Sequence, residues 1–269
     1  MIARVLVDGQ ARDQVSVLDR GLGYGDGLFE TIRFVGTDAP LWPRHMQRLE
    51  EGCRRLGLPM PGPALLQAEA RAAAQDMAAS VVRITLTRGV GARGYKPPAQ
   101  PQATRIVAAF EPPPADDAAQ SDGIRVRRCA TMLAPQPLLA GLKHLNRLEQ
   151  VLARAEWDDP AIAEGLLCDA DGLSISATAA NLFAVFAGRL ATPAVDRCGV
   201  AGVGRAEVLA AWPHAQVRPI PLDALHRADE LFLSSSVRGI VPIRELEGRG
   251  FAIGPVTRAL QAHWRGLGF

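Results

Sequence analysis

The chain has 269 residues, of which 48% are hydrophobic and 22% charged, and its formal net charge is only +2. This length is enough for one large domain or two smaller ones. The basic residues are scattered rather than clustered, which argues against nucleic-acid binding. No apolar run approaches the about 20 residues that span a bilayer, and residues 1–7 lack a signal-peptide layout. A cytoplasmic protein with neither membrane nor nucleic acid as a partner is expected.

The N-terminal part of the chain alternates strand and helix patterns. Alternating or continuous apolar runs predict strands, and apolar residues three or four apart predict helices. Residues 43–56 are the clearest helix, because Gly57 follows their apolar face as a stop signal. The predicted strands are 3–8, 15–18, 28–35, 81–87 and 104–110, and the predicted helices are 43–56 and 64–77.

A domain boundary is predicted at residues 111–122, where three prolines and four acidic residues occur without apolar spacing. Residues 1–110 would form an N-terminal α/β domain, 111–122 a linker, and 123–269 a C-terminal domain. In the last of these, strands are expected at 124–129, 166–168, 182–186 and 230–233, and helices at 147–156, 204–212 and 255–264. The fold class is mixed, α+β or α/β, in two domains.

Lys143 is the first candidate for chemistry, because the chain has 28 arginines and only two lysines. An arginine keeps its proton, whereas a lysine can lose it and form a Schiff base with an aldehyde. Asn146 and Glu149 have the spacing of a capping box, and Leu148 and Leu152 would lie on one packed helical face. A surface lysine without function is the alternative, which fits Lys96 better.

The segment Leu142–Leu152 resembles the active-site lysine segment of the 4-amino-4-deoxychorismate lyases. They are fold-type IV pyridoxal-phosphate enzymes, in the superfamily of branched-chain and D-amino acid aminotransferases. Residues 19–31 are also similar to this family's N-terminal signature. The resemblance implies a D-amino acid aminotransferase-like fold, a homodimer, and pyridoxal 5'-phosphate bound to Lys143 in the C-terminal domain.

The same resemblance implies the reaction, in which aminodeoxychorismate gives 4-aminobenzoate and pyruvate during folate biosynthesis. Lys143 would act as the general base. A branched-chain or D-amino acid aminotransferase is the alternative, and a non-catalytic cofactor carrier is a third possibility.

Three segments are candidates for the cofactor's phosphate. Glycines at a helix start leave backbone N–H groups open to an anion, which favours the backbone of Gly202 and Val203. The hydroxyls of Ser235 and Ser236 follow a predicted strand. The resemblance adds Arg48. Apart from the resemblance, residues 202–203 also fit an ordinary helix start, the two serines a polar turn, and Arg48 a solvated surface arginine.

Ser176 is where the chain departs from the family. The family usually has a glutamate five residues before the asparagine of Ala-Asn-Leu-Phe, here Asn181, and this carboxylate holds the pyridine nitrogen protonated. A serine hydroxyl does not stabilise the protonated ring in this way. We expect Ser176 to leave the ring a weaker electron sink, which disfavours transamination more than elimination.

Four residues are expected to contact the substrate or the reacting atoms. The arginine fork binds carboxylates, and Arg93, two residues before Tyr95, resembles a carboxylate-binding loop of the superfamily. A solvated loop arginine is the alternative. Phe29 stands where D-amino acid aminotransferases have a substrate-binding tyrosine, and Thr31 is a further candidate for the active site.

No metal is expected. The five histidines show no metal-ligand spacing, and the four cysteines contain no Cys-x-x-Cys pair. Cys53, Cys129, Cys168 and Cys198 are expected to be small buried apolar residues.

Overall fold

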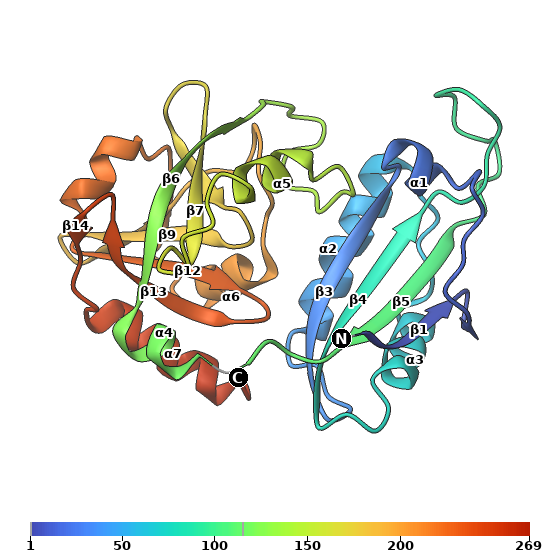
Figure 1. The fold of residues 1–269 in the computed structure, drawn as a ribbon, viewed down its shortest axis with the longest axis horizontal. Coiled ribbons are helices and arrows are strands. Elements are labelled where there is room, and N and C mark those ends of the chain that lie inside the picture. Colours follow the sequence, from blue (N-terminus) through green and yellow to red (C-terminus); the bar gives the residue numbers. More distant parts are fainter. Residues whose placement is uncertain (1, 115) are drawn as a thin grey trace. The chain divides into compact units, whose positions relative to one another are not determined.

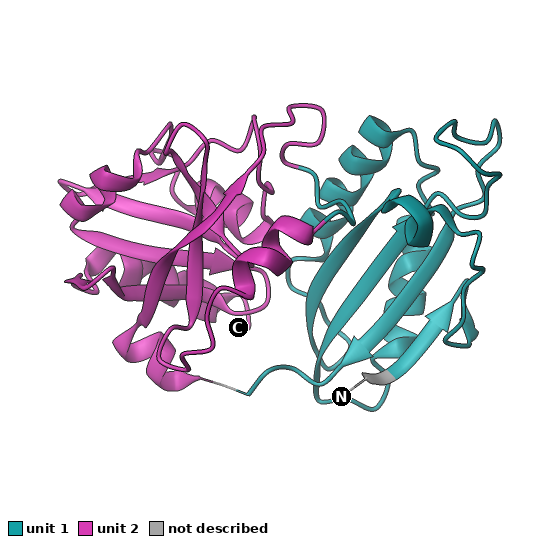
Figure 2. Cartoon of the chain, turned by 45° about the horizontal axis from the view of Figure 1, so that its top comes forward, with its two compact units in different colours: residues 1–114, 142–146 teal, residues 115–141, 147–269 magenta. Residues whose placement is uncertain are grey.

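The computed structural model describes residues 2–114 and 116–269, and the chain divides into two compact units. Unit 1 comprises residues 1–114 and 142–146, and unit 2 comprises residues 115–141 and 147–269 (Figure 2). The structure therefore groups Lys143 with the N-terminal residues. This differs from the predicted division, which placed the lysine in the C-terminal domain.

Unit 1 is a five-stranded antiparallel sheet in the order β2-β1-β5-β4-β3 (Figure 1). Its helices are α1, α2 and α3. The strands are β1 (Ile2–Val7), β2 (Gln10–Ala11), β3 (Gly27–Val35), β4 (Ala79–Thr87) and β5 (Thr104–Phe110), and the helices are α1 (Arg20–Tyr24), α2 (Trp42–Leu56) and α3 (Pro63–Ala73).

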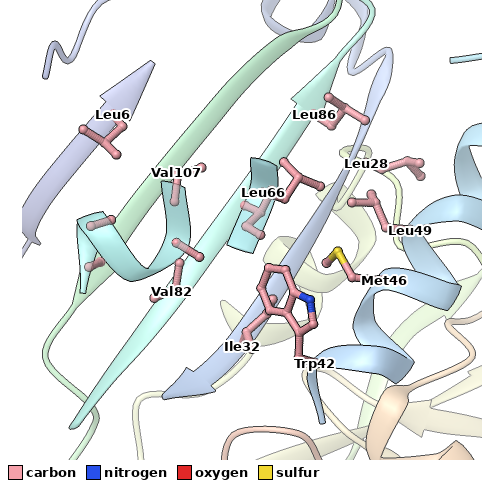
Figure 3. Packing of buried hydrophobic residues seen from close by; sticks show 14 of the residues in the cluster. Leu6, Leu28, Ile32, Trp42, Met46, Leu49, Leu66, Val82, Leu86 and Val107 are labelled. Atoms are coloured by element: carbon pink, nitrogen blue, oxygen red, sulfur yellow. The ribbon is translucent and has the colours of Figure 1, made fainter. Parts of the chain in front are cut away.

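The core of unit 1 lies between the sheet and its helices (Figure 3). Leu28 and Ile32 of β3 point toward α2, where they meet Met46 and Leu49. The side chains of a strand alternate between its two faces, so Phe29 and Thr31 lie on the other face of β3. The candidate residues Phe29 and Thr31 therefore lie on the face of β3 that points away from this core.

The termini of α2 explain why it spans these residues. Pro43 lies in its first turn, where a missing N–H costs nothing. Gly57 ends the helix in the left-handed conformation at φ 61°, and its N–H bonds to the carbonyls of Cys53 and Arg54. The predicted strand 104–110 coincides with β5, and the predicted helix 43–56 is confirmed except that α2 begins one residue earlier, at Trp42.

Unit 2 is built on a nine-stranded mixed sheet in the order β11-β10-β9-β12-β13-β6-β7-β8, with β14 paired to β13. The helices of unit 2 are α4 (Asp117–Asp122), α5 (Leu148–Arg154), α6 (Val203–Ala211), α7 (Pro255–Gly266) and a 3-10 turn, η1 (Leu222–Arg227). Its strands are β6 (Ile124–Leu133), β7 (Glu164–Asp169), β8 (Ser174–Ala177), β9 (Asn181–Phe186), β10 (Arg189–Thr192), β11 (Gln216–Val217), β12 (Glu230–Ser235), β13 (Gly239–Leu246) and β14 (Arg249–Gly250).

Three predicted elements before residue 124 differ clearly in the structure. Residues 15–18 form no strand: the Ser16 hydroxyl accepts a hydrogen bond from the N–H of Leu18, a local turn that competes with strand pairing. The second helix ends at Ala73 instead of residue 77. The second half of the predicted linker is the helix α4, because the Asp116 carboxylate caps its start by accepting from the N–H of Ala119.

The helix after the lysine also differs. It spans only Leu148–Arg154, and no capping box forms. The Asn146 amide donates to the carbonyl of Gly25, and the Glu149 carboxylate accepts from the N–H of Ala134. The predicted packed face is exposed in the single chain, with Leu148 76% and Leu152 62% exposed.

The four cysteines are buried free thiols, as predicted. Burial raises the pKa of Cys53 and of Cys129 to about 12, so these thiols are unreactive. Within the described residues no helix is long and apolar enough to cross a membrane, and no cluster of acidic, histidine or cysteine side chains could hold a metal ion.

Candidate active site

Lys143 lies along the free edge of β3 in unit 1. The N–H of Phe29 donates to the Lys143 carbonyl at 2.9 Å, and the N–H of Leu145 donates to the carbonyl of Gly27 at 3.0 Å. Between these two hydrogen bonds, His144 pairs with Leu28 in an antiparallel β-bridge. The lysine backbone is therefore fixed by the sheet and not by the helix that follows it.

The Lys143 amine lies over the ring of Phe29, with its Nζ 4.3 Å from the ring centroid. The guanidinium of Arg83, on the neighbouring strand β4, lies 4.1 Å from the same centroid. Thr31 pairs with Arg83 across the two strands. The structure thus brings together three predicted residues, Lys143, Phe29 and Thr31, and adds Arg83.

Arg48 is held by a carboxylate that the sequence interpretation missed. Its Nε donates to Oε1 of Glu30 at 2.8 Å, and its Nη2 donates to Oε2 of the same residue. Glu30 also bonds to Nδ1 of His45 at 2.6 Å. Both Arg48 and His45 belong to α2, so one carboxylate on β3 fixes two side chains of that helix.

The ionisation of this cluster follows from its burial. Burial opposes a charge on Glu30, but the charge of Arg48, that of His45 when it is protonated, and the hydrogen bonds from both residues prevail and lower the pKa of Glu30 to about 2. Burial also lowers the pKa of His45, and the Arg48 and Lys143 charges act in the same direction against the attraction of Glu30. At neutral pH, Glu30 is a carboxylate paired with Arg48, and His45 is neutral.

His45 leaves one polar atom unsatisfied. Its side chain is fully buried, and the described residues provide no hydrogen-bond partner for its Nε2. The signal for this cluster was present in the sequence, since Glu30 falls on the same strand face as Leu28 and Ile32. A charged residue at a core-facing position needs a partner.

Unit 2 contains the second group of candidates, at the start of α6. The N-cap of this helix is Gly202, and the described residues supply no side chain that caps it. The first-turn N–H groups of an α-helix lack intrahelical partners and attract anions. Val203 is buried at the first helical position.

Two glycines allow this helix start to approach its neighbours closely. A Cβ on Gly202 would overlap the amide oxygen of Asn181, whose Nδ2 donates to the carbonyl of Val200 at 2.9 Å. A Cβ on Gly204 would lie 2.9 Å from the carbonyl carbon of Ser235. The structure therefore brings Gly202, Val203 and Ser235 together within unit 2.

Two serines of β12 adjoin this helix start: the Ser235 backbone lies against Gly204, and Ser234 pairs with Asn181, whose amide lies against Gly202. The Ser235 Oγ accepts from the N–H of Arg238 at 3.0 Å, which closes the turn that also contains Ser236. The Ser234 hydroxyl is buried, and its oxygen has no hydrogen-bond partner among the described residues. Uncapped N–H groups beside an unsatisfied hydroxyl are the donors that a phosphate group requires, so this cradle fits one.

Ser176 is buried on β8, opposite Leu167 of β7. A buried carboxylate does occur nearby in the fold, on β7: Glu164 accepts from the Thr178 hydroxyl and from Nη2 of Arg238, the latter at 3.2 Å. The sequence interpretation missed this group, because Glu164 precedes an apolar run without a distinguishing motif.

The predicted substrate residues Arg93 and Tyr95 lie in unit 1, in the loop between β4 and β5. Both side chains are exposed, Tyr95 to 85%. The Tyr95 ring lies 5.5 Å from the ring of Tyr24.

Comparisons with known proteins agree with this architecture. The family model described as amino-transferase class IV matches residues 27–246. The aminodeoxychorismate lyase of Vibrio harveyi is 34% identical over 265 residues, which cover 96% of this chain and 98% of that protein.

Two solved structures extend the comparison to the fold. The 4-amino-4-deoxychorismate lyase of Pseudomonas aeruginosa superposes with a TM-score of 0.93 and 44% identity, covering 97% of this chain and 98% of its own. The branched-chain amino acid aminotransferase of Escherichia coli gives a TM-score of 0.84 at 24% identity, covering 99% and 94%, a likeness of fold alone. The chain thus has the predicted fold-type IV architecture and belongs to the class IV aminotransferase family, whose cofactor is pyridoxal 5'-phosphate.

Proposed function

We propose that this protein is a pyridoxal-phosphate-dependent lyase that converts 4-amino-4-deoxychorismate to 4-aminobenzoate and pyruvate, a step of folate biosynthesis. The observation that carries the proposal is the full-length similarity to the Pseudomonas aeruginosa lyase, 44% identity over 97% of the chain. The position of Lys143 supports it, because two backbone hydrogen bonds fix this segment on β3 and its amine lies over Phe29.

We assign the cofactor to the lysine and the phosphate-binding candidates named above. When bound, pyridoxal phosphate supplies an aldehyde for an amine and an electron sink for the electrons left by a departing proton. Lys143 would bond to the aldehyde. Arg48, the backbone of Gly202 and Val203, and the hydroxyls of Ser235 and Ser236 would bind the phosphate, and Ser176 would face the ring nitrogen.

Lys143 has a second proposed role, as the general base. The substrate's own amine would replace Lys143 at the aldehyde, and the freed lysine amine would take the proton from the ring carbon that carries the substrate's amino group. Loss of this proton lets the enolpyruvyl group leave from the adjacent carbon as the ring becomes aromatic. Lys143, or a water that it holds, would return a proton to the methylene carbon of the leaving enolpyruvate, giving pyruvate.

Four residues would hold the substrate. Arg93 would bind one of its carboxylates through the guanidinium fork, with Tyr95 beside it. Phe29 would pack against the ring, and Thr31 would contribute to the site from the same face of β3. Holding the reacting groups in a fixed geometry lowers the entropic part of the barrier.

An aminotransferase activity is the second candidate. It is favoured by the 29% identity over 282 residues to a protein of Methanocaldococcus jannaschii described as a branched-chain-amino-acid aminotransferase. The two functions separate in one assay: a lyase releases pyruvate from aminodeoxychorismate alone, whereas an aminotransferase requires a 2-oxo acid acceptor.

We also propose that the protein is a cytoplasmic homodimer. The observation in favour of a dimer is the apolar face of α5, where Leu148, Val151 and Leu152 are between 59% and 76% exposed. Exposed apolar clusters of this kind mark interaction surfaces.

The deciding experiment compares wild-type protein with Lys143→Ala, and uses Lys96→Ala as the control at the other lysine. Lys143→Ala should lose both the visible absorbance of the bound cofactor and pyruvate release, and Lys96→Ala should keep both. Full turnover by Lys143→Ala would refute the assignment. A wild-type protein that binds the cofactor and turns over neither substrate would favour a non-catalytic cofactor carrier.

A further inference from the structure

The loop between β4 and β5 carries Arg93 and Tyr95 but has no regular secondary structure of its own. Both side chains are exposed, so packing in the core does not fix the loop. A guanidinium binds a carboxylate well only if its position is set in advance, since ordering a flexible loop on binding costs free energy.

Arg20, which begins α1, bonds directly to this loop. Its side chain is only 4% exposed. Nη1 donates to the carbonyl of Gly94 at 2.9 Å, and Nη2 donates to the carbonyl of Tyr95 at 3.0 Å. The planar fork of one arginine thus holds two consecutive peptide groups of the loop.

Tyr24, at the other end of α1, holds the same residues from a second side. Its hydroxyl accepts a hydrogen bond from the N–H of Gly94 at 3.1 Å, and its ring packs against that of Tyr95. The Arg20 guanidinium lies 4.8 Å from the centroid of the Tyr24 ring. Gly94, at φ 106°, has both its N–H and its carbonyl bound by α1.

The network is anchored to the rest of unit 1 through Asp26. This carboxylate accepts from Nε of Arg20 at 2.9 Å and from Nε of Arg88 at 2.8 Å. Burial opposes the charge of Asp26, but these two arginines lower its pKa, so it is a carboxylate at neutral pH. Arg88 in turn donates to the carbonyls of Leu56 and Gly57, at the end of α2.

A glycine in the loop makes this arrangement possible. A Cβ on Gly91 would lie 2.8 Å from Cδ of Arg20, closer than real Cβ atoms approach their neighbours. The loop therefore approaches the Arg20 side chain at Gly91 and is hydrogen-bonded to it at Gly94 and Tyr95.

We propose that Arg20 and Tyr24 are positioning residues that hold the segment around Gly94 so that Arg93 is presented to a carboxylate of the substrate. The inference rests on the proposed function, in which the substrate is a cyclic dicarboxylate. Neither residue touches the reacting atoms. Their contribution is to substrate affinity, through the order of the loop, rather than to the chemical step.

The experiment uses the full-length protein loaded with cofactor and two variants. Tyr24→Phe removes the acceptor of the Gly94 N–H but keeps the ring next to Tyr95. Arg20→Lys keeps a positive charge beside Asp26 but loses the fork that holds both carbonyls. Arg12→Lys is the matched control, because Arg12 is exposed and pairs with Asp8 outside the loop.

Two readouts are measured on each variant. The first is the KM for aminodeoxychorismate, which we expect to rise about tenfold at unchanged kcat, since a hydrogen bond to an ordered group contributes about that much. The second is the rate at which trypsin cuts the folded protein after Arg93, which should increase as the loop loses its restraints. The Arg12→Lys control should change neither.

Other outcomes would overturn the inference. Unchanged KM and unchanged cleavage in Tyr24→Phe and Arg20→Lys would show that the loop is ordered by something else. A fall in kcat or loss of the cofactor absorbance at unchanged KM would show a general structural role. If the wild-type protein forms no 4-aminobenzoate, the proposed function fails, while the cleavage rates still decide whether Arg20 and Tyr24 order the loop.

Discussion

Glu30 illustrates how one residue sets the electrostatics of unit 1. It is buried among apolar side chains, yet its pKa is held at about 2 by Arg48 and His45. Compared with the ordinary value of 4.5, this shift corresponds to on the order of 3 kcal/mol of unfolding free energy at neutral pH. Removing one partner of such a pair leaves a buried charge uncompensated, which is strongly destabilising.

The protein should therefore lose stability in acid in two stages. Just below pH 6.5 the unfolded chain protonates His45 while the folded chain, with a lowered pKa, does not, so stability falls by up to about 1.4 kcal/mol per pH unit. Below pH 4.5 the unfolded chain protonates Glu30 while the folded chain does not, so stability falls again. The stabilisation that Glu30 provides is lost as the pH approaches 2.

Urea unfolding at pH 7.5, 6.5 and 5.5 measures the first stage. His45→Asn keeps an N–H donor for Glu30 but does not titrate, so its stability should change less over this range than that of wild type. His214→Asn is the control, because His214 is exposed. Equal slopes for wild type and His45→Asn would contradict the assignment of this stage to His45.

At the same scale, we expect Ser176 to favour elimination over amine transfer, the two reactions of the superfamily. We expect Ser176→Glu to increase amine transfer to a 2-oxo acid, because a carboxylate stabilises a protonated pyridine nitrogen. Ser176→Gln is the matched control, since it has nearly the same size and no charge. Both variants place a long side chain at a buried position, so the informative quantity is the difference between their rates of amine transfer. Equal rates for Ser176→Glu and Ser176→Gln would contradict the hypothesis.

At the scale of elements, the start of α6 requires a glycine at its N-cap, Gly202. Gly202→Ala should weaken pyridoxal phosphate binding about tenfold and lower the melting temperature, because its Cβ would overlap the Asn181 amide. Gly62→Ala is the control: Gly62 is also the N-cap of a helix, α3, but its Cβ would meet nothing within 4 Å. Cofactor fluorescence titration and thermal unfolding test both variants, and equal behaviour would contradict the prediction.

The elements also show which local signals are reliable. The predicted helix at 43–56 is confirmed, because its apolar period, a proline in the first turn and Gly57 all agree. Residues 15–18 have the apolar pattern of a strand, but Ser16 diverts the backbone into a turn. The composition of residues 111–122 concealed α4, which a single capping aspartate, Asp116, initiates.

At the scale of the whole molecule, the exposed face of α5 predicts association. Leu152→Glu should shift the protein from dimer to monomer, because a charge at the centre of an apolar contact is costly to bury. Leu65→Glu is the control, a partly exposed leucine on α3 that lies outside this face. Light scattering coupled to gel filtration measures the mass, and a Leu152→Glu dimer as stable as wild type would rule out this face.

The sequence by itself determined the fold class, the family and the candidate lysine, because these depend on local periodicity and on a short motif around Lys143. Only the tertiary structure decided what holds the candidates in place. Lys143 is fixed by β3, which lies over 100 residues earlier in the chain, Arg48 is held by Glu30, and the Arg93 loop is held by Arg20. These are contacts between residues distant in sequence, and a pattern in one segment carries no information about its partner in space.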